Sequence, residues 1–205
     1  KNIRFGFNAV KSMGRPTITA IIEERTNNGD FHSMQDFITR MAGAINKRTV
    51  EHLILAGAFD TFGNTRRGMM NVYERMIDSA VKQNKDAISG QMSLFDFVSE
   101  EDKQSLEMKV PDIQEFEKED LLEREKEVLG VYVTGHPLDE YTGMWEKHIS
   151  ARSTDFLIDE ETGQAKLMNG SKQTIGGLIS NIKVITTSSG QQMAYLTIEV
   201  FCWKC

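Results

Sequence analysis

The chain has 205 residues, of which 40% are hydrophobic and 26% charged, the composition of a globular protein with one large or two small domains. It begins with Lys1, so we expect it to be part of a longer protein. No apolar run approaches a membrane span, and two cysteines at the extreme end exclude a disulfide framework. These features favour a cytoplasmic location and no membrane partner.

The net charge of −6 is distributed unevenly along the chain. Residues 1–90 hold 13 Lys and Arg against 9 Asp and Glu, a balance of +4, whereas residues 91–171 hold 8 against 20, a balance of −12. Residues 172–205 hold 3 against 1, a balance of +2. We therefore expect only the two ends to face a polyanion.

Helical spacing of apolar residues dominates residues 8–84. A short helix near Ala9–Met13 is predicted to turn at Gly14 into a second helix, which begins at Pro16 and ends at Asn28-Gly29. Three further helices are predicted from their N-terminal caps, at Ser33 with Asp36, at Asn46 and at Asn64. The last is expected to run from Thr65 to about Asn84, after a tight turn at Ala56-Gly57-Ala58.

The second half of the chain has weaker periodicity. Residues 85–113 are predicted to be a linker, and residues 114–129 a charged helix whose carboxylates form a solvated face. Gly130–Tyr141 is expected to be a short strand or extended segment. Residues 175–198 alternate β-branched and aromatic residues around a Thr-Thr-Ser-Ser-Gly turn, which predicts a β-hairpin.

Two helical hairpins, at Ala9–Arg25 and Asn46–Asp60, suggest paired helix-hairpin-helix units. In such a unit a glycine-containing turn approaches a phosphate, and free N–H groups at the start of the next helix point at its oxygens. These contacts hold duplex DNA without reading its sequence. The candidate DNA-binding residues are Lys11, Ser12, Gly14, Arg15, Thr17, Lys47, Arg48, Gly57 and Arg66. Ordinary hairpins with solvated basic residues are the alternative.

A short motif in the linker predicts a docking peptide. It consists of Gln91, Met92, Ser93, Leu94 and Phe95. Two large apolar side chains can fill a preformed pocket on a partner, while the glutamine amide fixes the register. A peptide of this form docks on the sliding clamp of bacterial replication. The alternative is that the apolar pair packs on the core of its own chain.

Other chemical signals are weak. Lys183 and Tyr195 are candidates for binding single-stranded DNA if the hairpin begins an OB-type barrel. Cys202 and Cys205 have the spacing of a metal or redox pair, but a structural zinc needs four ligands and no second pair exists. We predict no metal site and no catalytic residue, because the sequence contains no P-loop, nucleophile elbow or paired carboxylates with catalytic spacing.

The order of these motifs resembles the C-terminal part of the alpha subunit family of bacterial DNA polymerase III. The resemblance rests on residues 3–11 (IRFGFNAVK), 46–60 (NKRTVEHLILAGAFD), 91–95 (QMSLF) and 125–138 (EKEVLGVYVTGHPL). It implies a fragment of a DNA-directed DNA polymerase whose catalytic aspartates and two Mg²⁺ ions lie in a palm domain outside this chain. The family usually has glycine where this chain has Ser12, in the first hairpin turn.

The resemblance also implies the domain layout and the partners. We expect a mainly α fold, a tandem helix-hairpin-helix bundle, followed by an α/β connector and an incomplete β segment of OB type. The predicted parts are a duplex-binding region (1–84), a linker with the clamp-binding peptide (85–113), a charged helix and connector (114–171) and truncated OB strands (172–205). Expected partners are duplex DNA, the clamp, other replisome subunits and single-stranded DNA. A non-enzymatic DNA-repair or recombination scaffold, or a purely structural helical domain, are the competing hypotheses.

Overall fold

The computed structural model describes residues 6–88, 108–160 and 163–200. The chain divides into two compact units, residues 1–134 and residues 135–205. The described part of the first unit is helical and the second contains a two-stranded antiparallel sheet, so the predicted fold class is confirmed. The predicted linker peptide at 91–95 lies outside the described residues.

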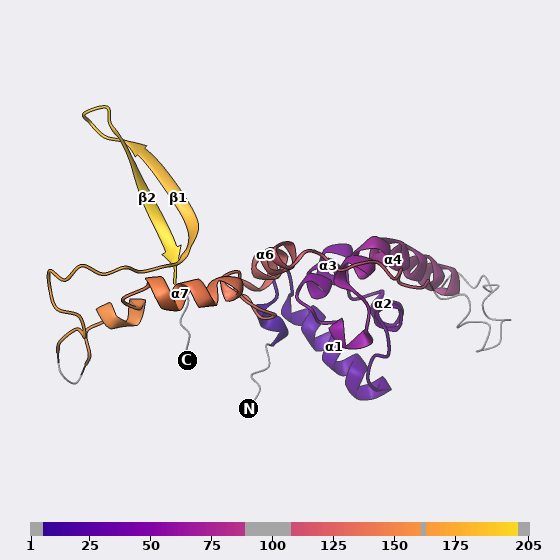
Figure 1. The fold of residues 1–205 in the computed structure, drawn as a ribbon. Helices are drawn as coiled ribbons and strands as arrows, with labels where there is room; N and C mark the ends of the chain where they lie inside the picture. The colour runs from indigo at the N-terminus through magenta and orange to yellow at the C-terminus, as the bar shows by residue number, and fades with distance from the viewer. Residues whose placement is uncertain (1–5, 89–107, 161–162, 201–205) are drawn as a thin grey trace. The chain divides into compact units, whose positions relative to one another are not determined.

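The first unit is a helical bundle (Figure 1). Its helices are α1 (Arg15–Asn28), α2 (Met34–Met41), α3 (Lys47–Leu55), α4 (Arg66–Ile88) and α6 (Lys118–Leu129), with 3-10 helices at Phe7–Ala9 and Asp60–Phe62. Helix α4 packs against α2 and α3, α6 packs on α3, and α1 packs on α2. Ile38, Val50, Ile54, Met69 and Met76 are completely buried at the centre.

Two of the predicted helix starts are confirmed by their caps. Ser33 accepts a hydrogen bond from the Asp36 N–H at 3.0 Å, and Asn46 accepts one from the Thr49 N–H at 2.9 Å. The cap of α4 was predicted one residue too early, because it is Thr65 whose hydroxyl accepts from the Gly68 N–H at 3.1 Å. The predicted helix at 9–13 is a 3-10 helix at Phe7–Ala9 followed by a turn.

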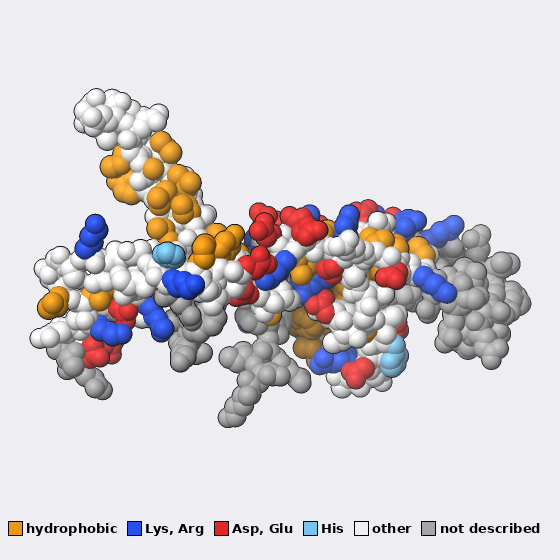
Figure 2. Space-filling model, viewed as in Figure 1, with side chains coloured by type: hydrophobic (Ala, Val, Ile, Leu, Met, Phe, Trp, Pro, Cys, Tyr) orange, Lys and Arg blue, Asp and Glu red, His pale blue; other side chains and the backbone are white. Residues whose placement is uncertain are grey.

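The prediction of a fully solvated acidic face on α6 is wrong at one residue. Glu125 is completely buried, whereas Glu119, Glu123 and Glu127 are exposed and α6 shows a strongly acidic surface (Figure 2). Of the two alternatives expected for Gly130–Tyr141, a short strand or an extended segment, the strand is not formed. Gly130 ends α6 in the left-handed region at φ 77°, and the chain then makes turns that lead to a 3-10 helix at Asp139–Tyr141.

The second unit contains α7 (Thr142–His148), a 3-10 helix at Ser153–Phe156, and the strands β1 (Leu178–Thr186) and β2 (Gln192–Glu199). The strands pair in antiparallel register around a turn at 187–191, which confirms the predicted hairpin. Their apolar side chains remain exposed in the described structure, including Ile182 at 57% and Val184 at 60%, and hydrophobic atoms run along the hairpin in Figure 2. The completion of an OB barrel stays a prediction.

Candidate nucleic-acid interface

The first hairpin turn holds five of the predicted DNA-binding residues, Lys11, Ser12, Gly14, Arg15 and Thr17. Ser12 has φ 65° and is the one described non-glycine residue with a positive φ. This conformation lets the chain reverse direction between Phe7–Ala9 and α1, and it is the conformation that glycine adopts most easily. The turn therefore requires a left-handed backbone at position 12, a conformation that glycine normally supplies.

The start of α1 is open to an external acceptor. Its N-cap is Gly14, which has no side chain, and its first turn contains no acidic residue. The first intrahelical bond runs from the Ile18 N–H to the Gly14 carbonyl at 3.1 Å, and Pro16 has no N–H. Within the described residues, the backbone N–H groups of Arg15 and Thr17 consequently have no recorded acceptor.

Two exposed cations flank this open helix start. The side chains of Lys11 and Arg15 make no recorded ion pair or hydrogen bond in the part of the chain that the structure describes. The Thr17 hydroxyl already has an acceptor within the unit, because it donates to the Ala44 carbonyl at 3.4 Å. Positive charge and unsatisfied N–H groups at one helix start are the elements of a phosphate-binding turn.

The second hairpin differs from the first because its polar groups are used internally. The N–H groups of Ala56, Gly57 and Ala58 donate to the carbonyls of His52, Ile54 and Leu53 at 2.9–3.0 Å. Helix α3 is capped by Asn46. Gly57 lies in the left-handed region at φ 75°, as the predicted turn requires. This turn is closed by its own hydrogen bonds.

The cations of the second hairpin are only partly free. Lys47 Nζ lies 3.0 Å from Asp78 and 3.3 Å from Glu74, and the hydrogen bond to Asp78 raises the lysine pKa. All three side chains are substantially exposed, so the pairs are weak but still offset the lysine charge. Arg48 is exposed and has no recorded partner among the described residues.

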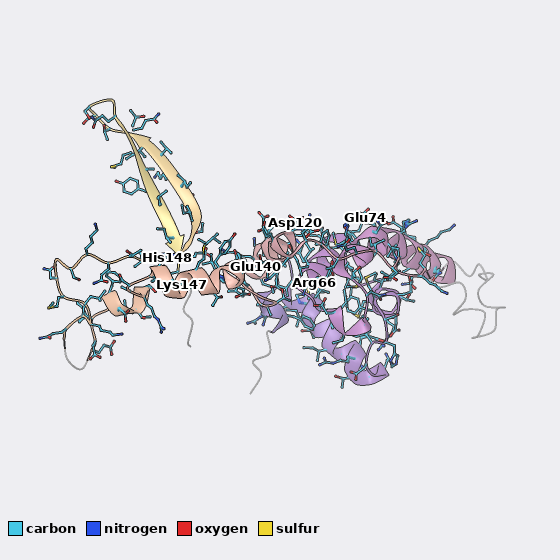
Figure 3. The ribbon with its side chains drawn as sticks, in the orientation of Figure 1. Arg66, Glu74, Asp120, Glu140, Lys147 and His148 are labelled. Carbon is cyan, nitrogen blue, oxygen red and sulfur yellow. The ribbon has the colours of Figure 1, made fainter. Side chains whose placement is uncertain are left out.

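Arg66 lies inside the helical unit rather than on its surface (Figure 3). Its guanidinium donates to Asp60 at 2.6 and 2.9 Å, to the Leu55 carbonyl at 3.0 Å and to Glu125 at 3.3 Å. Burial opposes the charge, but the hydrogen bond to Asp60 and the charges of Asp60 and Glu125 raise the pKa of Arg66. These contacts commit the arginine to the interior, and we leave it out of the phosphate-contacting set.

The start of α4 is likewise occupied. The carboxylate of Glu115 accepts from the N–H groups of Arg66 at 2.7 Å and Arg67 at 3.0 Å, although it lies about 50 residues away in sequence. Nothing in the local sequence around either arginine indicates this partner. Of helices α1 to α4, α1 is thus the one for which the described residues provide no side-chain cap.

The chain is similar to known proteins both in its hairpin region and over nearly all of its length. Residues 1–69 match the family model described as a helix-hairpin-helix motif. Over nearly all of its length, the chain is similar to DNA polymerase III alpha subunits. It is 32% identical to that of Vibrio cholerae over 198 residues, covering 96% of this chain and 16% of the relative. The corresponding protein of Chlamydia pneumoniae is 35% identical over 177 residues, covering 79% of this chain and 14% of the relative.

The match to the Escherichia coli K12 protein is 30% identical and covers 96% of this chain and 16% of the relative. The chain therefore spans about a sixth of the length of these relatives. The similarity supports the resemblance found from the motifs. None of the described helices is long and apolar enough to cross a membrane. Across residues 6–88, 108–160 and 163–200, no cluster of His, Cys, Asp or Glu has the arrangement of a metal site.

Proposed function

We propose that the helix-hairpin-helix region binds the phosphate backbone of duplex DNA, with the first turn making the principal contact. The proposal rests on the start of α1, which has no side-chain cap within residues 6–88, 108–160 and 163–200, and on the flanking cations Lys11 and Arg15, which have no recorded partner in those ranges. A phosphate oxygen would accept from the free N–H groups while the two side chains offset its charge. Because the contact is to the backbone, binding is independent of base sequence.

Charge reversal tests this proposal. Lys11→Glu/Arg15→Glu is compared with Arg75→Glu/Lys82→Glu, which makes the same change of charge at exposed positions of α4. Duplex affinity is measured by fluorescence anisotropy over a range of salt concentrations. The slope of log K against log salt is negative, and each lost phosphate contact makes it shallower by about 0.9, so the first pair should make it shallower by about 2. Equal losses in both pairs would refute a specific role for the first turn.

A third pair ranks the two hairpins. Lys47→Glu/Arg48→Glu should weaken DNA binding less than the Lys11/Arg15 pair, because Lys47 is already paired with Glu74 and Asp78. The matching helix-hairpin-helix description and the similarity to DNA polymerase III alpha subunits support DNA as the ligand of both. A larger loss from the second pair would reverse the proposed ranking.

We propose further that the chain is a segment of a DNA-directed DNA polymerase of the DNA polymerase III alpha type. The support is the similarity over 96% of the chain to subunits carrying that name. Nucleotidyl transfer, with its aspartates and Mg²⁺ ions, would lie outside this segment, which would hold the duplex product. In the full-length polypeptide, Lys11→Glu/Arg15→Glu should then shorten the products of one binding event while leaving single-nucleotide insertion unchanged.

The third part of the proposal is a tether to a bacterial sliding clamp through residues 91–95. The support is the motif itself, a glutamine, a spacer residue, a small polar residue and a Leu-Phe pair. Two weak attachments to one template raise each other's effective concentration and so lengthen residence. Leu94→Ala/Phe95→Ala should abolish binding in a titration against the clamp, whereas Phe97→Ala, just outside the motif, should not. Unchanged affinity in the double variant would refute the tether.

The hairpin of the second unit is proposed as a contact for single-stranded DNA. Lys183 lies directly opposite Tyr195 in the strand register, and Tyr195 is 58% exposed. A neighbouring cation and aromatic ring are the pair that binds a phosphate and stacks on a base. Tyr195→Ala should weaken binding of an oligothymidylate and leave duplex binding unchanged. The domain boundaries beyond the two units, the contacts with other replisome subunits and the cytoplasmic location remain predictions.

A further inference from the structure

The backbone of Lys11 is held from both sides by distant parts of the first unit. Its N–H donates to the Val128 carbonyl in the last turn of α6 at 2.9 Å. Its carbonyl lies 2.7 Å from Nδ1 of His52, in the last turn of α3. Since a carbonyl can only accept, Nδ1 must carry the hydrogen. Both polar groups of the peptide backbone at position 11 are therefore occupied.

The two hydrogen bonds on Lys11 matter because the next residue, Ser12, has a strained backbone. Ser12 is held at φ 65°, a conformation that a residue with a side chain adopts at a cost. Such a conformation persists only when surrounding contacts determine it. The two hydrogen bonds on Lys11 are the recorded tertiary contacts immediately before that strained residue, and Gly14 and α1 follow it. The Lys11 side chain is exposed and has no recorded partner in the described part of the chain.

We infer that His52 is a positioning residue for phosphate binding by the first hairpin turn. It fixes the backbone of Lys11, and through it the strained turn that leads to the open N–H groups of α1. The second hairpin thus supports the first by a side-chain contact in addition to its own proposed, weaker contact with DNA. This inference rests on the proposed function.

The alternative role for His52 is purely structural, one hydrogen bond that stabilises the fold and leaves the turn unaffected. The two roles are distinguished by variants of different donor capacity. His52→Asn retains an N–H donor on a shorter side chain, whereas His52→Leu keeps bulk and removes the donor. His32→Leu is the matched control, because His32 is an exposed histidine in the loop before α2 with no recorded ring contact among the described residues.

Duplex affinity and amide hydrogen exchange are measured on the full 205-residue chain and its variants. His52→Leu should bind DNA about fivefold more weakly, the factor expected for one lost hydrogen bond. Its slope of log K against log salt should be shallower by about 0.9, the value of one lost phosphate contact. The Lys11 N–H should exchange faster, because its bond to Val128 then opens more often. His52→Asn should restore most of the affinity, and His32→Leu should match the unmodified chain.

The following results would contradict the inference. Unchanged exchange at Lys11 in His52→Leu would show that the histidine does not hold the turn. Faster exchange with unchanged DNA affinity and salt slope would make the bond merely structural. If the unmodified chain does not bind duplex DNA, the proposed function fails and the DNA role of His52 fails with it. The exchange measurement would still decide whether His52 holds the turn.

Discussion

The guanidinium of Arg66 lies 3.3 Å from the carboxylate of Glu125, with exposed side-chain fractions of 4% and 0%. The pair joins the start of α4 to the middle of α6. The second oxygen of Glu125 accepts from the N–H groups of Val133 at 2.7 Å and Thr134 at 2.9 Å, which fixes the chain after α6. One buried carboxylate therefore connects the end of the second hairpin to the last residues of the first unit.

Removing the charge of Glu125 should destabilise the first unit severely. Glu125→Gln leaves Arg66 less compensated in the interior and places its NH₂ donor against another donor, either the Arg66 guanidinium or the N–H groups of Val133 and Thr134. Breaking a buried pair from one side costs about 3–5 kcal/mol. Glu123→Gln is the matched control, since Glu123 is exposed on the same helix, and it should change stability by less than about 0.5 kcal/mol. Urea denaturation measures both.

A double variant separates the net contribution of the ion pair to stability from the cost of leaving one buried charge without its partner. Arg66→Met/Glu125→Leu removes both charges and retains apolar bulk, so it should be less destabilising than Glu125→Gln. The hydrogen bonds to Asp60, Val133 and Thr134 would still be lost. The single variants Arg66→Met and Glu125→Leu complete the cycle, and a double variant as unstable as their sum would show that the two charges are not coupled.

Arg66 also leaves no room for a side chain at the glycine of the Ala56-Gly57-Ala58 turn. A Cβ at Gly57 would clash with Arg66 Nη2 and lie 2.7 Å from the carboxylate of Asp60. Gly63 has a similar backbone, φ 79° against 75°, but open space around it. Gly63→Ala should therefore cost only the left-handed strain, about 1–2 kcal/mol. Gly57→Ala should cost about 1–3 kcal/mol more, because the added methyl group displaces the ion pair.

Thermal or urea denaturation of the two alanine variants provides the measurement. Equal destabilisation would mean that Arg66 and Asp60 move aside without loss, and that the ion pair does not constrain the turn. The comparison isolates the clash because the backbone requirement at the two glycines is nearly the same.

Local patterns predicted most of the helices, and tertiary contacts account for the differences. Ser33 and Asn46 were recognisable because an N-cap bonds to a residue three positions ahead. Glu125 was not, because its neighbours in a charged run are solvated and its partner Arg66 is 59 residues away. A strand, one of the two alternatives expected after Gly130, does not form for a related reason, since Glu125 accepts from backbone N–H groups that a strand would offer to a neighbour.

The candidate interface was predictable in part. Glycine, proline and nearby cations marked the first turn correctly as a hairpin, and the structure adds that its helix start is uncapped. No periodic pattern in the sequence indicates that Arg66 points inward or that His52 contacts Lys11. Both depend on how α3, α4 and α6 pack, and that packing is set by apolar residues far apart in the chain.

Substitution of Ser12 should test the strain in the first turn. Ser12→Gly relieves the cost of φ 65° but increases the freedom of the unfolded chain, so a net gain of about 0.5–1 kcal/mol is expected. Ser12→Val should lose about 1–2 kcal/mol, because a β-branched residue is disfavoured there. Urea denaturation compares the two. Effects of the same sign would contradict a strained turn.

Tyr73 provides a test at alkaline pH. It lies on α4 with 6% of its surface exposed, and its hydroxyl donates to Glu74 at 3.3 Å. Burial, together with the charges of Glu51 and Glu74, raises the pKa of Tyr73 to about 12 from an ordinary value of 10.0. The folded chain therefore keeps a proton that the unfolded chain loses between these pH values.

Stability must fall with pH in that interval, because the unfolded state binds fewer protons than the folded one. The contribution is fully present below about pH 10 and is lost as the pH rises to about 12, with an upper limit of about 2–3 kcal/mol. Urea denaturation at a series of alkaline pH values should show this loss in the unmodified chain and a smaller one in Tyr73→Phe. Tyr195→Phe, at an exposed position of β2, should retain the full pH dependence. An identical pH dependence in all three proteins would exclude Tyr73 as its source.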